Sequence, residues 1–248
     1  MIKISPIFFT IILLLLSTIS FSQTLQFGTL SSFEAYTGSG AITNSGTLTG
    51  DVGTNDGAVT GFSSVDYSGE IYNDDSVTVQ ARIDLFKVYI NLCSVFVTHA
   101  GTHSPTFGSG ETITSGVYSI GGAGSVGGTL TLDGEGDSDA VFIMKFEGAF
   151  TTGAASAIVL SNGAQAANVF WIAEGAISVG ASSTIKGTLL SHPGSVSIGA
   201  NCNIEGRLFA SEGAITIGNQ SVAVIPVSPT TIPITCSGFP IPSPTLDV

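Results

Sequence analysis

The apolar and polar positions of residues 168–224 recur at every nineteenth position without a gap, so that residues 168–186, 187–205 and 206–224 form three repeats. Each repeat carries two glycines, and the pairs are Gly175 and Gly180, Gly194 and Gly199, and Gly213 and Gly218. A repeat this short cannot enclose a core alone, so it buries its apolar side against the repeats stacked above and below it. A coil of this length holds about three short strands. The pattern therefore predicts a mostly β fold, a three-faced β-solenoid.

The first strand of each repeat is apolar on both of its sides. Its adjacent apolar residues are Phe170 and Trp171, Leu189 and Leu190, and Leu208 and Phe209. A strand with one wet side would alternate apolar and polar residues, so a second element must cover the outer side. We expect the stacked residues Trp171, Leu190 and Phe209 to be core positions under that element rather than a ligand groove.

Residues 75–96 show the helical period that the covering element needs. Their apolar positions recur every three or four residues, at Ala81, Leu85, Val88, Tyr89 and Leu92. The polar residues Gln80, Asp84, Lys87 and Asn91 fall on the opposite, solvent side. Asp74, Asp75 or Ser76 is suited to the N-cap. The sequence predicts one long α-helix packed along one face of the solenoid.

The two ends of the chain differ from the repeats. Residues 1–22 combine Lys3, an apolar run over residues 7–16 and a small-residue cleavage site, which is the pattern of a signal peptide. Residues 23–226 are expected to form the solenoid domain, in which residues 25–70 supply early coils. Six of the nine prolines lie in residues 226–244, so we interpret residues 227–248 as a Pro-rich tail or linker. We expect a secreted or cell-surface protein.

A four-residue motif, Gly-[Ala/Ser]-apolar-[Ser/Thr], begins another side of the coils. It starts at Gly40, Gly57, Gly148, Gly175, Gly194 and Gly213. If its apolar residue points inward, the small residues on either side point outward and form a flat, uncharged surface. Small residues also stack well in any solenoid, but six occurrences without a charge favour a binding surface. The candidate binding residues are Ala41, Thr43, Thr60, Ala149, Thr151, Ala176, Ser178, Ser195, Ser197, Ala214 and Thr216.

Charge and composition narrow the partners of this surface. The chain has 6 basic and 18 acidic residues, a balance that repels nucleic acid and anionic membranes, and no apolar run beyond the signal peptide is long enough to enter a bilayer. The surface holds no acid–base pair and nothing that grips a phosphate. Ranks of methyl and hydroxyl groups at a fixed repeat suit ordered water, and a flat array suits a repeating crystalline ligand better than a small molecule.

The remaining reactive residues give little support to catalysis or metal binding. Cys93, Cys202 and Cys236 allow three single pairings and leave one thiol unpaired, and Cys202 falls at an inward position where a thiol packs as core. No second Cys or His lies at metal-ligand spacing. Residues 133–139 resemble half of a calcium loop without its distal glutamate, and we favour a solvated turn. We expect no enzyme activity, no metal and no cofactor.

Several segments together resemble the microbial ice-binding (antifreeze) proteins, which have a discontinuous β-solenoid braced by one α-helix. The resemblance covers roughly residues 25–226, and its motifs are Gly50-Asp51-Val52-Gly53, Gln80-Ala81-Arg82-Ile83-Asp84-Leu85, Gly116-Val117-Tyr118, Asn168-Val169-Phe170-Trp171 and Gly206-Arg207. It implies a monomer that binds the ice crystal surface through one flat face. Many members show Thr-Ala/Gly-x-Thr/Asn on that face, whereas this chain has Gly175, Gly194 and Gly213 at the first position.

Two functions remain open at this point. The first is an exported ice-binding protein that adsorbs to ice and restrains ice growth or recrystallisation. The second is a solenoid adhesin that uses the same face for a partner protein or glycan.

Overall fold

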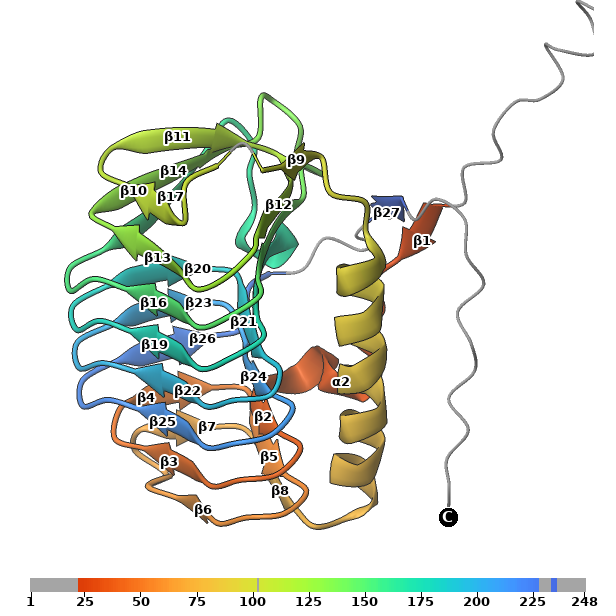
Figure 1. Ribbon diagram of the computed structural model, residues 1–248. Coiled ribbons are helices and arrows are strands. Elements are labelled where there is room, and N and C mark those ends of the chain that lie inside the picture. The colour runs from red at the N-terminus through yellow and green to blue at the C-terminus, as the bar shows by residue number, and fades with distance from the viewer. Residues whose placement is uncertain (1–21, 102, 228–232, 236–248) are drawn as a thin grey trace, which may run out of the picture.

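The computed structural model describes residues 22–101, 103–227 and 233–235. Figure 1 shows a stack of coils with one long helix, α2 (Ser76–Ser94), along one side. Three sheets of parallel strands run the length of the stack. The fold is therefore the predicted discontinuous β-solenoid with a bracing helix.

We name the three sheets by what they carry, and give their strands in spatial order. The helix sheet faces α2 and contains β8 (Ile71–Asn73), β5 (Asp51–Thr54), β2 (Phe33–Thr37), β24 (Leu208–Ala210), β21 (Thr188–Ser191), β18 (Val169–Ala173), β15 (Phe142–Phe146), β12 (Gly116–Ile120) and β9 (His99–Ala100). The hydroxyl sheet contains β10 (Thr106–Gly108), β13 (Gly124–Gly127), β16 (Phe150–Thr152), β19 (Ile177–Val179), β22 (Val196–Ile198), β25 (Ile215–Ile217), β3 (Ile42–Asn44) and β6 (Val59–Thr60).

The mixed sheet is the third side, and short elements lie outside the three sheets. The mixed sheet contains β11 (Glu111–Thr114), β14 (Thr129–Asp133), β17 (Ala157–Ser161), β20 (Thr184–Lys186), β23 (Asn203–Glu205), β26 (Val222–Val224), β4 (Thr47–Thr49) and β7 (Tyr67–Ser68). Two 3-10 helices are η1 (Gly28–Ser32) and η2 (Ala166–Asn168). In the tail, β27 (Pro233–Thr235) pairs antiparallel with β1 (Ser22–Thr24).

The coils are not stacked in sequence order. The coil of β2, β3 and β4 pairs with the coil of β24, β25 and β26, so an early coil lies against the last one. Helix α2 then carries the chain back along the stack to β9 (Figure 1). Its 19 residues span about 28 Å at about 1.5 Å per residue, or roughly six strand spacings of about 4.8 Å. The helix is thus both the return path and the cover of the helix sheet.

Helix α2 begins with a capping box, because the Asp75 carboxylate accepts from the Thr78 N–H and the Thr78 hydroxyl accepts from the Asp75 N–H. The predicted stripe is confirmed, since Ala81, Leu85, Val88 and Leu92 are buried against the helix sheet.

The prediction for Asp84, on the polar side of the helix, is wrong. Asp84, predicted on the solvent side, is 7% exposed. Its carboxylate accepts from the Thr29 N–H at 2.9 Å, from Gln80 at 3.0 Å and from Lys87 at 3.1 Å. Although burial raises its pKa, these hydrogen bonds lower the pKa of Asp84 below its usual value. The carboxylate ties α2 to η1.

The residues that pack under α2 also differ from the prediction at one position. Phe170, Ile172, Leu190 and Phe209 pack in the cluster under α2, whereas Trp171 points into the solenoid core. Trp171 pairs with Leu189, while the sequence repeat aligns it with Leu190. The reason is the corner after the strand: three residues separate Ala173 from Ile177, and four separate Ser191 from Val196. The sequence repeat is therefore one position out of step with the strand register here.

The last turn of α2 is held by a cation from the helix sheet. The Lys145 ammonium donates to the carbonyls of Cys93 and Val95, both at 2.8 Å. We expect Lys145→Met to lower the free energy of unfolding by about 1–3 kcal/mol, because charged hydrogen bonds to terminal carbonyls are lost. Denaturant unfolding measures this, with Lys87→Met as a control for an exposed lysine whose ammonium pairs with Asp84 on the same helix. Equal effects of the two substitutions would contradict the expectation.

Candidate functional site

The outward hydroxyls of the hydroxyl sheet form one continuous rank. Strand register places a Ser or Thr directly beside the next across every pair of neighbouring strands. In spatial order the rank is Thr106, Ser125, Thr151, Ser178, Ser197, Thr216, Thr43 and Thr60. Each side chain is exposed or half-buried, and between the two end strands the residues on either side of it are buried. Eight strands thus present eight hydroxyls spaced about 4.8 Å apart.

A second rank of small side chains runs beside the first, just before the strands. Backbone hydrogen bonds join its members, because the residue after each one donates its N–H to the carbonyl of the next member. In spatial order the rank is Ala123, Ala149, Ala176, Ser195, Ala214, Ala41 and Ala58. Its side chains are exposed or half-buried. The two ranks together form a surface of methyl and hydroxyl groups without a charge.

The hydroxyls in the middle of the rank are available to solvent. Within the described part of the chain, Thr151, Ser178, Ser197 and Thr216 make no side-chain hydrogen bond to protein. Only the ends of the rank bond internally: Thr60 donates to Thr43 at 3.4 Å, and Ser125 to Thr106 at 3.3 Å. A hydroxyl both donates and accepts, so each free group can hold ordered water.

A ladder of stacked rings supports this surface from inside. Phe107 contacts Phe146 edge-on, Phe146 stacks on Phe150 at 4.8 Å, and Phe150 stacks on Trp171 at 5.1 Å. All four side chains are almost fully buried. Behind the later coils, Ile177, Val196, Ile215 and Ile42 continue the buried layer. The rigid packing fixes the strands and holds the outward ranks flat.

At some of the coils, the glycine that precedes the Ala/Ser rank is required by the backbone. Gly213 has a φ of 104°, which favours glycine, and a Cβ there would meet the Gly194 carbonyl carbon at 2.8 Å. Gly40 has a φ of 131°, and its Cβ would meet the Gly213 carbonyl carbon at 2.5 Å. The coils turn from the helix sheet into the hydroxyl sheet at these glycines and touch through their backbones. A threonine does not fit at Gly40 or Gly213.

All eleven residues predicted from the motif lie on this one face. Thr106, Ser125 and Ala123 also lie on this face and were not predicted, and neither was Ala58, although it follows Gly57 in the motif. Thr106 and Ser125 are separated by the same interval that separates Ser178 from Ser197 and Ser197 from Thr216. This shared interval could have identified Thr106 and Ser125 from the sequence. In register with the motif, His103 stands for the glycine and Pro105 for the apolar residue before Thr106, and Gly124 stands for the apolar residue before Ser125, so the four-residue motif did not find them.

The other sides of the molecule do not show this pattern. On the mixed sheet the Lys186 ammonium donates to the Glu205 carboxylate at 2.6 Å, so this side carries charges. In the acidic loop, the Glu135 N–H and the Asn162 amide donate to the Asp133 carboxylate and lower its pKa. Among the described residues, no group of three or more His, Cys, Asp or Glu side chains is arranged to hold a metal.

The cysteines that the structure describes agree with a packing role for Cys202. Cys202 is 2% exposed and unpaired in the core, as predicted for an inward position. Cys93 is half-buried on α2 and also unpaired, and burial raises the pKa of its thiol. Cys236 lies outside the described residues.

These features define a class of protein: a β-solenoid in which one uncharged face repeats small side chains at the spacing of β-strands. The model of the Ice-binding-like family matches residues 36–223. The chain belongs to this family, which is a family of ice-binding proteins and not of enzymes.

Individual relatives agree with this assignment. An ice-binding protein of Nostoc sp. (strain HG1) is 34% identical over 167 residues, which cover 66% of this chain and 61% of that protein. Ice-binding protein 1 of Shewanella frigidimarina (strain NCIMB 400) is 39% identical over 45% of this chain and 13% of its own length. The match therefore spans less than two thirds of each of these relatives.

Solved structures show the same fold. The crystal structure of an ice-binding protein from an Antarctic bacterium of the Flavobacteriaceae has a TM-score of 0.79 and 36% identity, covering 83% of this chain and 48% of that one. The ice-binding protein from the Antarctic ascomycete Antarctomyces psychrotrophicus has a TM-score of 0.75 and 28% identity, covering 83% and 100%.

Two regions of the domain scheme lie largely outside the structural description. The predicted signal peptide, residues 1–22, is described only at its last residue, and the tail of residues 227–248 only at residue 227 and in β27. In the portions that the structure does describe, no helix has both the length and the apolar character needed to cross a bilayer.

Proposed function

We propose that the mature chain is an exported protein that adsorbs to ice through the hydroxyl sheet and inhibits ice growth or recrystallisation. The observation that carries the proposal is the unbroken rank of eight hydroxyls beside a rank of methyl-sized side chains. Ice is a solid of water at fixed spacing. A rigid face that holds water in register can merge with that solid over its whole length.

Charge and shape support the same ligand. A charged group would hold its own hydration shell and disturb ordered water, and the two ranks contain no charged side chain. The hydroxyl face is flat, whereas a small molecule needs a concave site. One copy carries the complete face, so the proposed function requires no second subunit. We accordingly propose a monomer that acts outside the cell.

The test is ice recrystallisation in the presence of purified mature protein, residues 23–248. We expect the unmodified protein to slow crystal coarsening. Ser178→Tyr and Thr216→Tyr should remove most of this activity, because each ring stands above the flat rank and holds the face away from ice. Both side chains are exposed on strand interiors, so the variants should fold.

The matched controls are Asn203→Tyr and Thr47→Tyr, at exposed strand positions of the mixed sheet. They should keep full activity. Activity that survives at the two hydroxyl-sheet sites would show that another face binds ice. An unmodified protein that neither shapes ice nor slows recrystallisation would favour the adhesin.

A further inference from the structure

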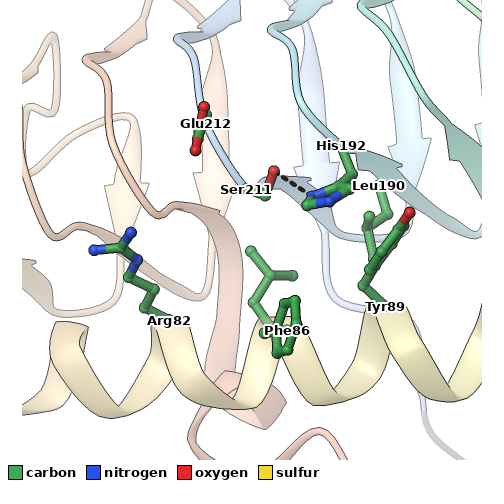
Figure 2. A pocket seen from close by; sticks show the side chains of 8 residues that line it. Arg82, Phe86, Tyr89, Leu190, His192, Ser211 and Glu212 are labelled. Atoms are coloured by element: carbon green, nitrogen blue, oxygen red, sulfur yellow. Dashed lines mark hydrogen bonds between the residues drawn. The ribbon is translucent and has the colours of Figure 1, made fainter. Parts of the chain in front are cut away.

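A cavity of about 230 Å³ lies between α2 and the C-terminal ends of β21 and β24. Its floor is apolar, because Leu85 and Leu190 line it and are 2% and 1% exposed. Phe86, on the helix, lines it as well and is 46% exposed. Figure 2 shows these side chains with the polar residues of the rim. The cavity thus offers an aromatic surface that the fold does not bury.

The polar groups of the rim retain hydrogen-bonding capacity. Arg82 and Glu212 are exposed, and neither side chain makes a hydrogen bond or ion pair with another described residue. The His192 Nδ1 and the Ser211 hydroxyl bond each other at 2.7 Å, which leaves the second ring nitrogen of His192 for a ligand. Tyr89 is engaged, because its hydroxyl donates to Glu174 at 2.6 Å and its ring lies on His192 at 4.0 Å.

We propose that this cavity binds one pyranose ring of a neutral glycan. A guanidinium and a carboxylate beside one cavity favour a ligand whose groups accept from the first and donate to the second, as sugar hydroxyls do. The apolar floor and the Phe86 ring fit the C–H face of a pyranose. A volume of about 230 Å³ is below the roughly 300–1,000 Å³ of drug-sized ligand sites, which suits a single ring. The net charge of −12 disfavours an anionic ligand.

This site is separate from the proposed ice-binding face. His192 and Glu212 lie in the corners that precede Gly194 and Gly213, and their side chains line the cavity beside α2. No residue of the hydroxyl rank or of the Ala/Ser rank lines the cavity. The inference therefore goes beyond ice binding, and either function can fail without the other.

Isothermal titration of the mature protein with the methyl glycosides of glucose, galactose and mannose tests the proposal. We expect saturable binding of at least one glycoside. Glu212→Gln and Phe86→Ala should weaken that binding about tenfold, since each removes one contact with the ring. Glu205→Gln, a half-buried carboxylate of the mixed sheet, is the matched control and should bind normally. All three variants should inhibit ice recrystallisation as strongly as the unmodified protein does.

Three results would overturn the proposal. The first is the absence of saturable binding by all three glycosides. The second is unchanged binding in both Glu212→Gln and Phe86→Ala. The third is tighter binding of the zwitterion phenylalanine than of any glycoside, because it would assign Arg82 and Glu212 to opposite charges of an amino acid. If the unmodified protein does not inhibit ice recrystallisation, the proposed function is refuted, but the proposal of a glycan site is not.

Discussion

Gly213→Thr is expected to lower the free energy of unfolding by about 3 kcal/mol and to add nothing to ice activity. The substitution places threonine where many members of the family carry it. Gly213 has a φ of 104°, a conformation that costs a β-branched residue of order 1–3 kcal/mol. Its Cβ would also lie 2.8 Å from the carbonyl carbon and oxygen of Gly194, which are backbone atoms of the next coil.

The comparison variant is Gly122→Thr, in the corner between β12 and β13. A Cβ at Gly122 meets no atom within 4 Å, and its φ is not in the region that favours glycine. We expect its effect to stay within about 1 kcal/mol. Urea unfolding measures both variants, and recrystallisation is measured below the unfolding transition. A Gly213→Thr protein as stable as Gly122→Thr, or more active than the unmodified chain, would contradict the argument.

The glycines that precede the Ala/Ser rank have a structural role in the stacking of the coils. In the sequence, glycine stands at the first position of the pattern, where the family that the chain resembles often has threonine. The structure shows that glycine sets the close approach of successive coils, at which Gly40, Gly194 and Gly213 meet through backbone atoms. The binding surface is then the Ala/Ser rank and the hydroxyl rank, without the first threonine.

Much of the fold could be predicted because its signals are local. The regular interval of the repeats reflects one complete coil, and Asp75 caps the helix through contacts with Thr78, close by in the sequence. The position of Asp84 could not be predicted in the same way. Its burial depends on the Thr29 N–H, which lies 55 positions earlier in the chain. A polar residue on a helix surface is normally solvated, and only tertiary contact reverses that expectation.

The candidate site was predictable for the same reason, and only in part. Coils with the regular interval reveal Ser178, Ser197 and Thr216 directly. Insertions upstream lengthen the intervals from Ser125 to Thr151 and from Thr151 to Ser178, so the regular spacing fails there. The contact between Thr216 and Thr43 joins residues from opposite ends of the domain sequence. No short-range pattern orders these residues along the rank, so its continuity is a property of the folded stack.

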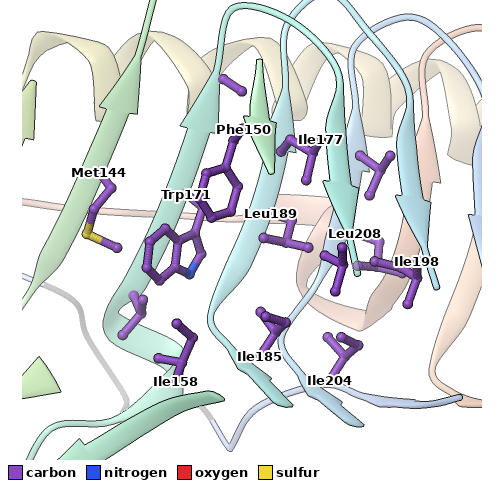
Figure 3. Packing of buried hydrophobic residues seen from close by; sticks show 14 of the residues in the cluster. Met144, Phe150, Ile158, Trp171, Ile177, Ile185, Leu189, Ile198, Ile204 and Leu208 are labelled. Carbon is purple, nitrogen blue, oxygen red and sulfur yellow. The ribbon is translucent and has the colours of Figure 1, made fainter. Parts of the chain in front are cut away.

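Trp171→Ala is expected to lower the free energy of unfolding by about 3–5 kcal/mol, the cost of a large cavity in a packed core. Trp171 is fully buried and belongs to the solenoid core, not to the cluster under α2. Its ring packs on Phe150 at 5.1 Å (Figure 3), as the close view of the core shows. Its N–H donates to the Lys186 carbonyl at 2.9 Å. Alanine leaves a void behind the hydroxyl face and removes the hydrogen bond to the Lys186 carbonyl.

The position of Trp171 also determines which substitutions act independently. If Trp171 lay under the helix, Trp171→Phe and Leu85→Ala would share one cavity and their effects would not add. Because the structure places them in separate clusters, we expect their effects on unfolding free energy to add within about 0.5 kcal/mol. Phe209→Leu and Leu85→Ala, both under α2, should not add. If the effects of Trp171→Phe and Leu85→Ala depart from additivity as much as those of Phe209→Leu and Leu85→Ala, Trp171 must lie in the cluster under α2. Additive effects would agree with a position of Trp171 in the core behind the hydroxyl sheet. There Phe150 stacks on Trp171, and the next residue, Thr151, carries one hydroxyl of the rank.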